Sequence, residues 1–281
     1  GSGADTVITL VGAAIQANDS VHAGAGSDTL EAGGGHDTMD GGDGSDTLIV
    51  DYSWTGENIT SALETQTFRN AADSLAVNYY NIEQFDVRTG SGADYIQTGN
   101  GQDSVSTGSG DDKIDTPLGL AFVHGGSGAD WWLANFSAVT AKAILDLNKP
   151  SQIFLGGRVQ GIEQLTLSTG SGKDKIVTLT GAAKAYGDYV HTGGGDDLIK
   201  VGGGHDTADG GDGNDTLVVD YGWATEAISS GFESQAFRNA ADTIAVNYYN
   251  VENFDVTTGS GNDFIQTGAG KDKVATGAGD D

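Results

Sequence analysis

Aspartate recurs at every ninth residue along much of this chain. Around each one the pattern is x-G-x-G-x-D-x-h-x, in which h is an apolar residue. Carboxylates at so regular a spacing, beside glycines that let backbone carbonyls come close together, favour a hard cation with oxygen ligands over acid–base catalysis. The four runs are Asp19, Asp28, Asp37 and Asp46; Asp94, Asp103, Asp112 and Asp130; Asp188, Asp197, Asp206 and Asp215; and Asp263, Asp272 and Asp281.

Each nine-residue repeat predicts a turn followed by a short strand whose middle residue points inward. Two turns and two strands make one coil of 18 residues, so stacked coils place Asp28 one coil below Asp46 and Asp94 one coil below Asp112. Bare carboxylates about 4.8 Å apart repel each other by roughly 1 kcal/mol in water, and by more at lower dielectric. A divalent cation removes this repulsion. Calcium suits irregular shells of loop oxygens better than magnesium, which demands a near-ideal octahedron.

A longer repeat lies over the shorter one. The segment "GGHDTMDGGDGSDTLIVDY" returns 169 residues later as "GGHDTADGGDGNDTLVVDY". We interpret the chain as an excerpt from a longer tandem array. The predicted fold class is all-β, with runs of parallel β-roll alternating with small β spacer modules that cover the open ends of each roll. The roll runs are 1–50, 89–133, 169–219 and 258–281, and the spacers are 51–88, 134–168 and 220–257.

Composition narrows the class of protein. The 281 residues carry a net charge of −27, which argues against binding nucleic acid through phosphate contacts and against an anionic membrane surface. There is no cysteine, and no signal peptide or long apolar run is visible. Aromatic and β-branched residues recur at fixed places, which is not typical of a disordered acidic chain. So large a negative charge indicates that the folded chain needs bound cations, which the sequence itself does not supply.

At the nonapeptides the chain resembles the repeats-in-toxin (RTX) family. "GGDGSDTLI" (41–49), "TGNGQDSVS" (98–106) and "GGDGNDTLV" (210–218) are similar to its GGxGxDxUx repeat. The resemblance implies a parallel β-roll that binds calcium between successive coils. One turn would offer the carbonyls of its second and fourth residues and its aspartate. The turn one coil on would offer the carbonyls of its first and third residues and its aspartate.

The ligands that this resemblance implies fall in all four runs. In the first two runs they are Asp19, Gly24, Gly26, Asp28, Gly33, Gly35, Asp37, Gly41, Asp43, Asp46, Gly90, Gly92, Asp94, Gly99, Gly101, Asp103, Thr107, Ser109, Asp112, Gly125, Ser127 and Asp130. In the last two they are Asp188, Gly193, Gly195, Asp197, Gly202, Gly204, Asp206, Gly210, Asp212, Asp215, Gly259, Gly261, Asp263, Asp272, Thr276, Ala278 and Asp281.

Some positions depart from the repeat. Ala121 stands where an aspartate belongs, which puts in doubt the site that would pair it with Asp103. The repeats "AAIQANDSV" and "AAKAYGDYV" keep their aspartates but lose glycines, so they resemble weak or capping turns. Asp5 and Asp174 stand fourteen residues before the next repeat and are predicted to lie out of register.

Other chemistries fit the sequence less well. The five histidines occupy outward turn or strand-edge positions, and no zinc-protease, EF-hand, P-loop or catalytic-triad pattern is present. The pairs Tyr79–Tyr80 and Tyr248–Tyr249, with Trp54 and Trp223, are interpreted as spacer cores, with sugar stacking as the alternative. Of Trp131 and Trp132, one ring is expected to cap a roll. Threonines at the first repeat position leave ice binding as a further alternative: Thr89, Thr98, Thr107 and Thr116.

The sequence thus predicts a calcium-binding structural segment of a large secreted or cell-surface bacterial protein, and not an enzyme. The resemblance implies a Gram-negative source and type I secretion, with folding triggered by extracellular calcium. The tandem unit favours a stalk, adhesin or surface-layer protein. The alternative is an accessory module of a secreted protease, lipase or alginate epimerase that aids export or holds polysaccharide. Expected partners are neighbouring tandem units and, as an alternative, a surface glycan, without nucleic acid or membrane insertion.

Overall fold

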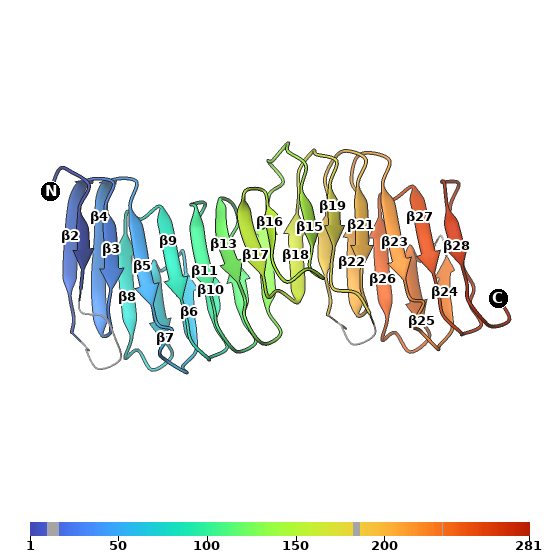
Figure 1. The fold of residues 1–281 in the computed structure, drawn as a ribbon, viewed down its shortest axis with the longest axis horizontal. Helices are drawn as coiled ribbons and strands as arrows, with labels where there is room; N and C mark the ends of the chain where they lie inside the picture. The colour runs from blue at the N-terminus through green and yellow to red at the C-terminus, as the bar shows by residue number, and fades with distance from the viewer. Residues whose placement is uncertain (10–16, 182–185, 232) are drawn as a thin grey trace. The chain divides into compact units, whose positions relative to one another are not determined.

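The computed structural model describes residues 1–9, 17–181, 186–231 and 233–281, with residues 120 and 121 described by their backbone only. Within these ranges the regular structure consists of β-strands, and no helix occurs (Figure 1). The strands form two compact units: unit 1 comprises Gly1–Ala134 and Gly156–Ile162, and unit 2 comprises Asn135–Leu155 and Glu163–Asp281. The predicted all-β parallel roll is confirmed. No helix in the described part of the chain is long and apolar enough to span a membrane.

Unit 1 has two sheets, and the chain passes from one to the other at nearly every strand. The first sheet is parallel throughout, in the spatial order β1 (Thr6–Ile8), β3 (Thr29–Ala32), β5 (Thr47–Asp51), β9 (Gln84–Arg88), β11 (Asp103–Ser106), β13 (Leu120–His124) and β17 (Gly157–Gln160). The second runs in the order β2 (Ser20–Gly26), β4 (His36–Gly44), β8 (Ala76–Tyr80), β7 (Thr67–Asn70), β6 (Ile59–Ala62), β10 (Tyr95–Gln97), β12 (Lys113–Asp115) and β14 (Trp131–Asn135).

Unit 2 repeats this plan. One sheet is parallel, in the order β15 (Ile144–Asp146), β19 (Lys175–Val177), β21 (Leu198–Val201), β23 (Thr216–Asp220), β27 (Asn253–Thr257) and β28 (Lys273–Ala275). The other runs in the order β18 (Gln164–Ser168), β20 (Tyr189–His191), β22 (His205–Asp209), β26 (Ala245–Tyr249), β25 (Ala236–Asn239) and β24 (Ile228–Gly231). The residues of the short strand β16 (Gln152–Phe154) also belong to unit 2, outside these two sheets.

The core of each unit is built from the apolar residue two positions after each aspartate. Leu30 lies opposite Leu48 in the parallel ladder, and both side chains have no exposed surface. The same holds for Ile96 and Ile114 on the other sheet. The inward position predicted by the x-h-x pattern is therefore confirmed for these coils. The last coil differs, because Val274 in β28 is 46% exposed.

The segment 51–88 extends the stack of coils. Its strands β6, β7 and β8 form an antiparallel meander, as expected for a small β module. However, β8 pairs in parallel with β4, and β9 pairs in parallel with β5. The module therefore covers the open end of the roll, as expected, and it does so by extending the stack. Its strands satisfy the edge of the roll by continuing the hydrogen-bond ladder, and segment 220–257 does the same through β26 and β27.

The aromatic residues divide between core and surface. The rings of Tyr79 and Phe85 are 5.0 Å apart and buried, and Tyr248 and Phe254 repeat this pair at 4.9 Å. These tyrosines are core residues, whereas the neighbouring Tyr80 and Tyr249 are nearly half exposed. Trp54 is 38% exposed, with its ring edge-on to that of Tyr52. Trp132 is fully buried, and its indole N–H donates to the Thr116 hydroxyl at 2.8 Å.

Candidate calcium-binding turns

The aspartates of successive coils lie in rows along the turns. Each row is held by one repeated hydrogen bond, in which the backbone N–H of one aspartate donates to Oδ1 of the aspartate one coil on. Asp28 donates in this way to Asp46 at 2.7 Å, and Asp94 donates to Asp112 at 2.8 Å. The pairs predicted from the spacing are thereby confirmed. The same bond joins Asp19 to Asp37, Asp112 to Asp130, Asp188 to Asp206, Asp197 to Asp215 and Asp263 to Asp281.

The second carboxylate oxygen is buried in most of these aspartates. Although Oδ1 accepts a backbone N–H, Oδ2 meets no backbone donor in hydrogen-bond geometry among the described residues. Threonine hydroxyls interact with some of these carboxylates, as Thr89 does with Asp94 and Thr192 does with Asp197. A buried carboxylate oxygen in this state is costly unless a cation or a proton satisfies it. The residues concerned are Asp28, Asp37, Asp46, Asp94, Asp103, Asp112, Asp174, Asp197, Asp206 and Asp215.

Backbone carbonyls come close to the next coil at the same turns. The carbonyl oxygen of Gly90 lies 2.2 Å from the place where a Cβ on Gly108 would stand, so only glycine fits there. Several of the implied carbonyl ligands also accept backbone N–H groups; for example, Gly90 accepts from Ser109 at 2.9 Å, and Ser127 accepts from Gly110 at 3.0 Å. Since a carbonyl oxygen has two lone pairs, these bonds leave each oxygen one further interaction. The donor set of carboxylates and carbonyls fits calcium.

Burial raises the pKa of several aspartates in these rows. It raises the pKa of Asp94, Asp103, Asp188 and Asp197 to about 6, against opposing hydrogen bonds. Burial, followed by the charge of Asp188, raises the pKa of Asp206 to about 8. Without a cation, Asp206 holds a proton near neutral pH, and the other four carboxyl groups take up protons as the pH falls through about 6. Calcium and protons therefore compete for the same oxygens.

The family comparison agrees with this geometry. A family model described as the RTX calcium-binding nonapeptide repeat matches the chain in four copies, at residues 16–48, 87–116, 184–217 and 255–281. The chain belongs to the RTX repeat family. RTX nonapeptide repeats are known calcium binders, and the turns described above belong to these repeats. A search of curated proteins finds no match. Which individual RTX residues contact each ion stays a prediction.

Two aspartates that the sequence placed out of register belong to the RTX rows. The N–H of Asp5 donates to Oδ1 of Asp28 at 2.7 Å, and the N–H of Asp174 donates to Oδ1 of Asp197 at 2.7 Å. Each pair is 23 residues apart, five more than the predicted coil. The prediction for Asp5 and Asp174 is therefore wrong. A coil can lengthen while its aspartate keeps its place, because strand pairing and the Oδ1 bond fix the register.

Other predicted ligands have no aspartate on the next coil. Asp103 lies opposite Leu120, and its N–H donates to the Gly119 carbonyl at 3.2 Å instead of to a carboxylate. Asp37 lies opposite Val77, and Asp206 lies opposite Val246. On its other side, Asp103 accepts the N–H of Phe85. The glycine-poor repeats before Asp19 and Asp188 fall partly on residues 10–16 and 182–185, outside the described ranges.

Glutamates in the spacers continue the RTX rows, which the sequence reasoning missed. Oε2 of Glu83 accepts the N–H of Asp46 at 2.8 Å, and Oε2 of Glu252 accepts the N–H of Asp215 at 2.9 Å. Beside Asp46, the carbonyl of Asn81 and Oδ2 of Asp46 both point to the Cβ position of Gly41, at 2.3 and 2.5 Å. The closing motifs "NIEQF" and "NVENF" were the available signal, because they place glutamate at one point of both copies.

We expect E83A to destabilise the junction between roll and spacer. The variant leaves the N–H of Asp46 without its carboxylate acceptor, and a hydrogen bond to a charged group contributes about 1–2 kcal/mol here. Urea denaturation in saturating calcium measures the change in the free energy of unfolding. The matched control is E64A, at an exposed position of the same spacer, which should change it by less than about 0.5 kcal/mol. Equal effects of the two variants would contradict the role of Glu83.

Two of the histidines pair with aspartates, and the threonines considered for ice binding are buried. His22 and His191 pair with Asp40 and Asp209, with Nδ1–Oδ2 distances of 2.6 and 3.0 Å. The described residues contain no group of three or more His, Cys, Asp or Glu side chains arranged to hold a metal, in keeping with turns that offer mainly carbonyl oxygens. The four threonines considered for ice binding are at most 3% exposed, so that alternative is wrong: Thr89, Thr98, Thr107 and Thr116.

The raised pKa values predict an unusual pH dependence. In calcium-free buffer, folded-state pKa values above the unfolded value near 3.8 mean that protonation favours the folded state. This contribution is fully present below the unfolded pKa and is lost as pH rises through about 6 to 8. We therefore expect more β structure near pH 5 than near pH 8 without calcium, measured by circular dichroism. With calcium, the apparent affinity should instead weaken on acidification. A calcium-free chain that folds better near pH 8 would contradict both statements.

Proposed function

We propose that this chain is a calcium-folded structural segment of a large secreted or cell-surface bacterial protein, and that it is not itself a catalyst. The observation that carries the proposal is the set of rows of buried carboxylates whose Oδ2 atoms meet no backbone donor. Such rows are stable only when cations or protons fill them. RTX repeats are typical of secreted bacterial proteins, and extracellular calcium is abundant enough to saturate weak sites.

A stalk, adhesin or surface-layer protein is the type we favour. The sequence repeats after 169 residues, and within each unit the parallel ladder continues through the spacer. Such a unit can be joined end to end with its neighbours, which would be its main partners. Type I secretion follows as part of the proposal, because an array that repels itself without calcium would stay unfolded during export. The alternative is an RTX module that assists a secreted enzyme, for which sequence beyond this segment is the direct check.

The test counts calcium ions on the folded chain. Equilibrium dialysis against millimolar calcium, followed by elemental analysis, should find several ions per chain and few after dialysis against magnesium. The variant D112N keeps an oxygen to accept the N–H of Asp94 but removes one carboxylate from the row Asp94–Asp112–Asp130. We expect it to lose the ions on either side of this coil. A wild-type chain without bound calcium, or an unchanged count in D112N, would refute the proposal.

A further inference from the structure

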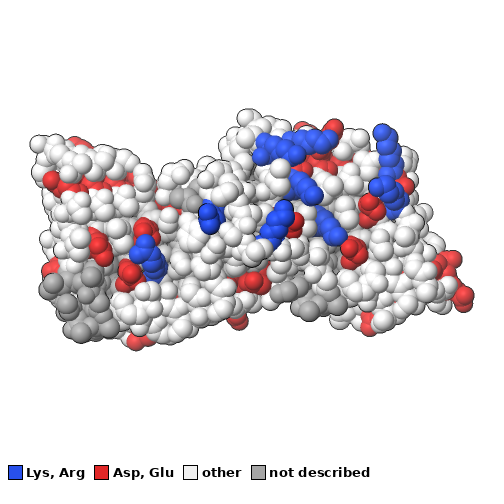
Figure 2. Space-filling view, viewed as in Figure 1, with Lys and Arg blue, Asp and Glu red and all other residues white. Residues whose placement is uncertain are grey.

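Lysines gather in one groove of unit 2. Five of the nine lysines in the chain line a hollow of about 480 Å³ along the sheet of β19, β21, β23, β27 and β28. Figure 2 shows blue side chains concentrated over these strands, on a protein whose net charge is −27. The lysines are Lys142, Lys173, Lys175, Lys271 and Lys273.

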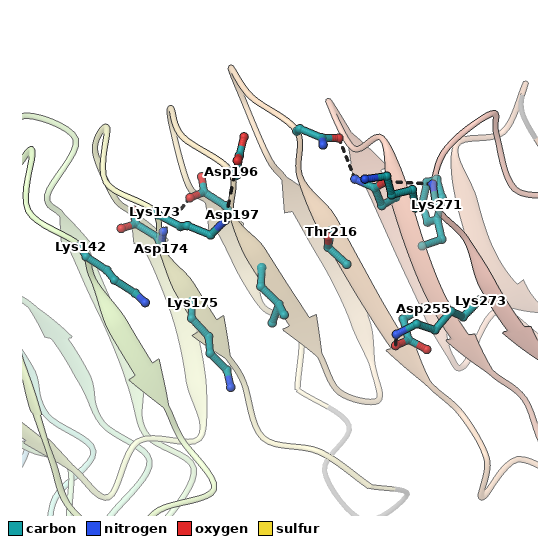
Figure 3. Close-up of a pocket in the computed structure, with 14 residues that line it drawn as sticks. Lys142, Lys173, Asp174, Lys175, Asp196, Asp197, Thr216, Asp255, Lys271 and Lys273 are labelled. Atoms are coloured by element: carbon teal, nitrogen blue, oxygen red, sulfur yellow. Dashed lines mark hydrogen bonds and ion pairs between the residues drawn. The ribbon is translucent and has the colours of Figure 1, made fainter.

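Three of these cations form no ion pair among the described residues, although the charge of Lys142 acts on Asp174. Lys173 pairs with Asp196 at 3.7 Å, and Lys273 pairs with Asp255 at 3.2 Å (Figure 3). Among the described residues, Lys142, Lys175 and Lys271 form no ion pair. Asp174 and Asp197 also line the groove, but they are almost fully buried and belong to one of the aspartate rows. The accessible charge of the groove is therefore positive.

The first copy of the repeat provides a natural comparison. Residues 169 positions earlier keep the scaffold of the groove, since Thr47, Phe85 and Asp86 correspond to Thr216, Phe254 and Asp255. The lysines are not kept. Where unit 2 has Lys173, Lys175, Lys271 and Lys273, the first copy has Ala4, Thr6, Gln102 and Ser104. The fold thus forms without these lysines, which indicates that they serve something other than folding.

We propose that this groove binds a carboxylated polysaccharide. From β19 to β28 the groove crosses four strand spacings, about 19 Å, which exceeds a single small anion and suits a chain with repeated charges. The Thr216 hydroxyl lies between its two lysine ends (Figure 3), and the Asn214 side chain also lines the groove; both groups match the hydroxyl groups of a sugar. The inference goes beyond the structural role proposed above.

Other polyanions fit the groove less well. Its one aromatic side chain, Phe254, is 4% exposed, so no ring is available to stack on a nucleobase. The strong negative charge of the whole protein also opposes nucleic acid. Lysine presents a hydrated point charge without the rigid fork of arginine, which favours loose, salt-sensitive contacts with carboxylates along a flexible chain.

The experiment is isothermal titration of trigalacturonate into the calcium-saturated chain, with folding checked by circular dichroism and equal calcium in both solutions. This probe carries three carboxylates for the three lysines that form no ion pair, and maltotriose is its neutral control. We expect one site that weakens with added salt, and no binding of maltotriose. The variant K142Q/K175Q/K271Q should bind roughly tenfold more weakly or worse, since each exposed contact contributes modestly. K149Q, a lysine outside the groove, should bind as wild type.

Substitutions in the first copy test the same inference in the opposite direction. T6K/Q102K places lysines at the exposed counterparts of Lys175 and Lys271, and should add a second, weaker site. A folded, calcium-loaded wild type that fails to bind trigalacturonate would overturn the inference and leave the calcium role untouched. So would equal affinity of wild type and K142Q/K175Q/K271Q. Equal binding of a tri-aspartate peptide would overturn the assignment to a sugar.

Discussion

In calcium-free buffer at neutral pH the chain is expected to be expanded and poor in β structure, and millimolar calcium should fold it cooperatively. The rows Asp5–Asp28–Asp46 and Asp174–Asp197–Asp215 bring carboxylates to within one strand spacing of each other. Their Oδ2 atoms are mostly buried without backbone donors. On folding, the ionised carboxylates therefore lose their hydrating water and are brought close to one another. Because each ion would link two coils, binding at one site should favour binding at the next.

Circular dichroism and light scattering during a calcium titration measure this transition. The gain in β signal and the fall in radius should coincide at a free calcium of roughly 10⁻⁴ to 10⁻³ M, the range of extracellular calcium modules. Magnesium at the same concentration should have little effect, since it prefers a regular octahedron and keeps its water. A chain already compact and β-rich without calcium at neutral pH would show that packing of the apolar core alone suffices.

The repeating part of the fold could be predicted from the sequence because one short rule generates it. The x-h-x strands place Leu30 over Leu48, and the nine-residue spacing places Asp28 beside Asp46. Both relations follow from counting residues, since a coil of fixed length brings residue i to residue i + 18. The resemblance to RTX repeats then supplied the cation.

The irregular part could not be found by counting. Asp5 reaches Asp28 across 23 residues, and Asp46 meets Glu83 across 37, so neither partner lies at a multiple of nine. In both cases strand pairing decides the register, and pairing depends on where the inserted residues leave the sheet. The way in which the spacer covers the roll could not be found by counting for the same reason. Its antiparallel strands are visible as alternation, but the parallel pairing of β8 with β4 joins residues about 40 apart.

The lysine groove shows a second limit of sequence reasoning. Lys142, Lys175 and Lys271 lie far apart in the chain, and each is unremarkable in its own repeat. Stacking of the coils brings them to one groove. Comparison of the two copies would have provided a signal, because charge differs at positions where the surrounding residues are the same.

Gly108 and Gly99 provide a matched test of what the turn glycines do. Both occupy the second position of a nonapeptide, nine residues apart. Gly108 has φ of +87°, and a Cβ there would stand 2.2 Å from the carbonyl oxygen of Gly90. Gly99 has no atom within 4 Å of its Cβ position and no positive φ, since the turn below it is the short connection between β8 and β9.

We expect G108A to lower the free energy of unfolding in calcium by about 3 kcal/mol or more. The left-handed backbone alone costs an alanine about 1–2 kcal/mol, and relief of the collision must displace the Gly90 carbonyl or the coil that carries it. Because Gly90 is an implied ligand, the calcium midpoint of folding should also rise. G99A should be neutral or slightly stabilising, by up to about 1 kcal/mol, through a less flexible unfolded chain. Urea denaturation and calcium titration of both variants decide the matter. If both lose the same stability, glycine is needed at this position for a reason other than the approach of the neighbouring coil.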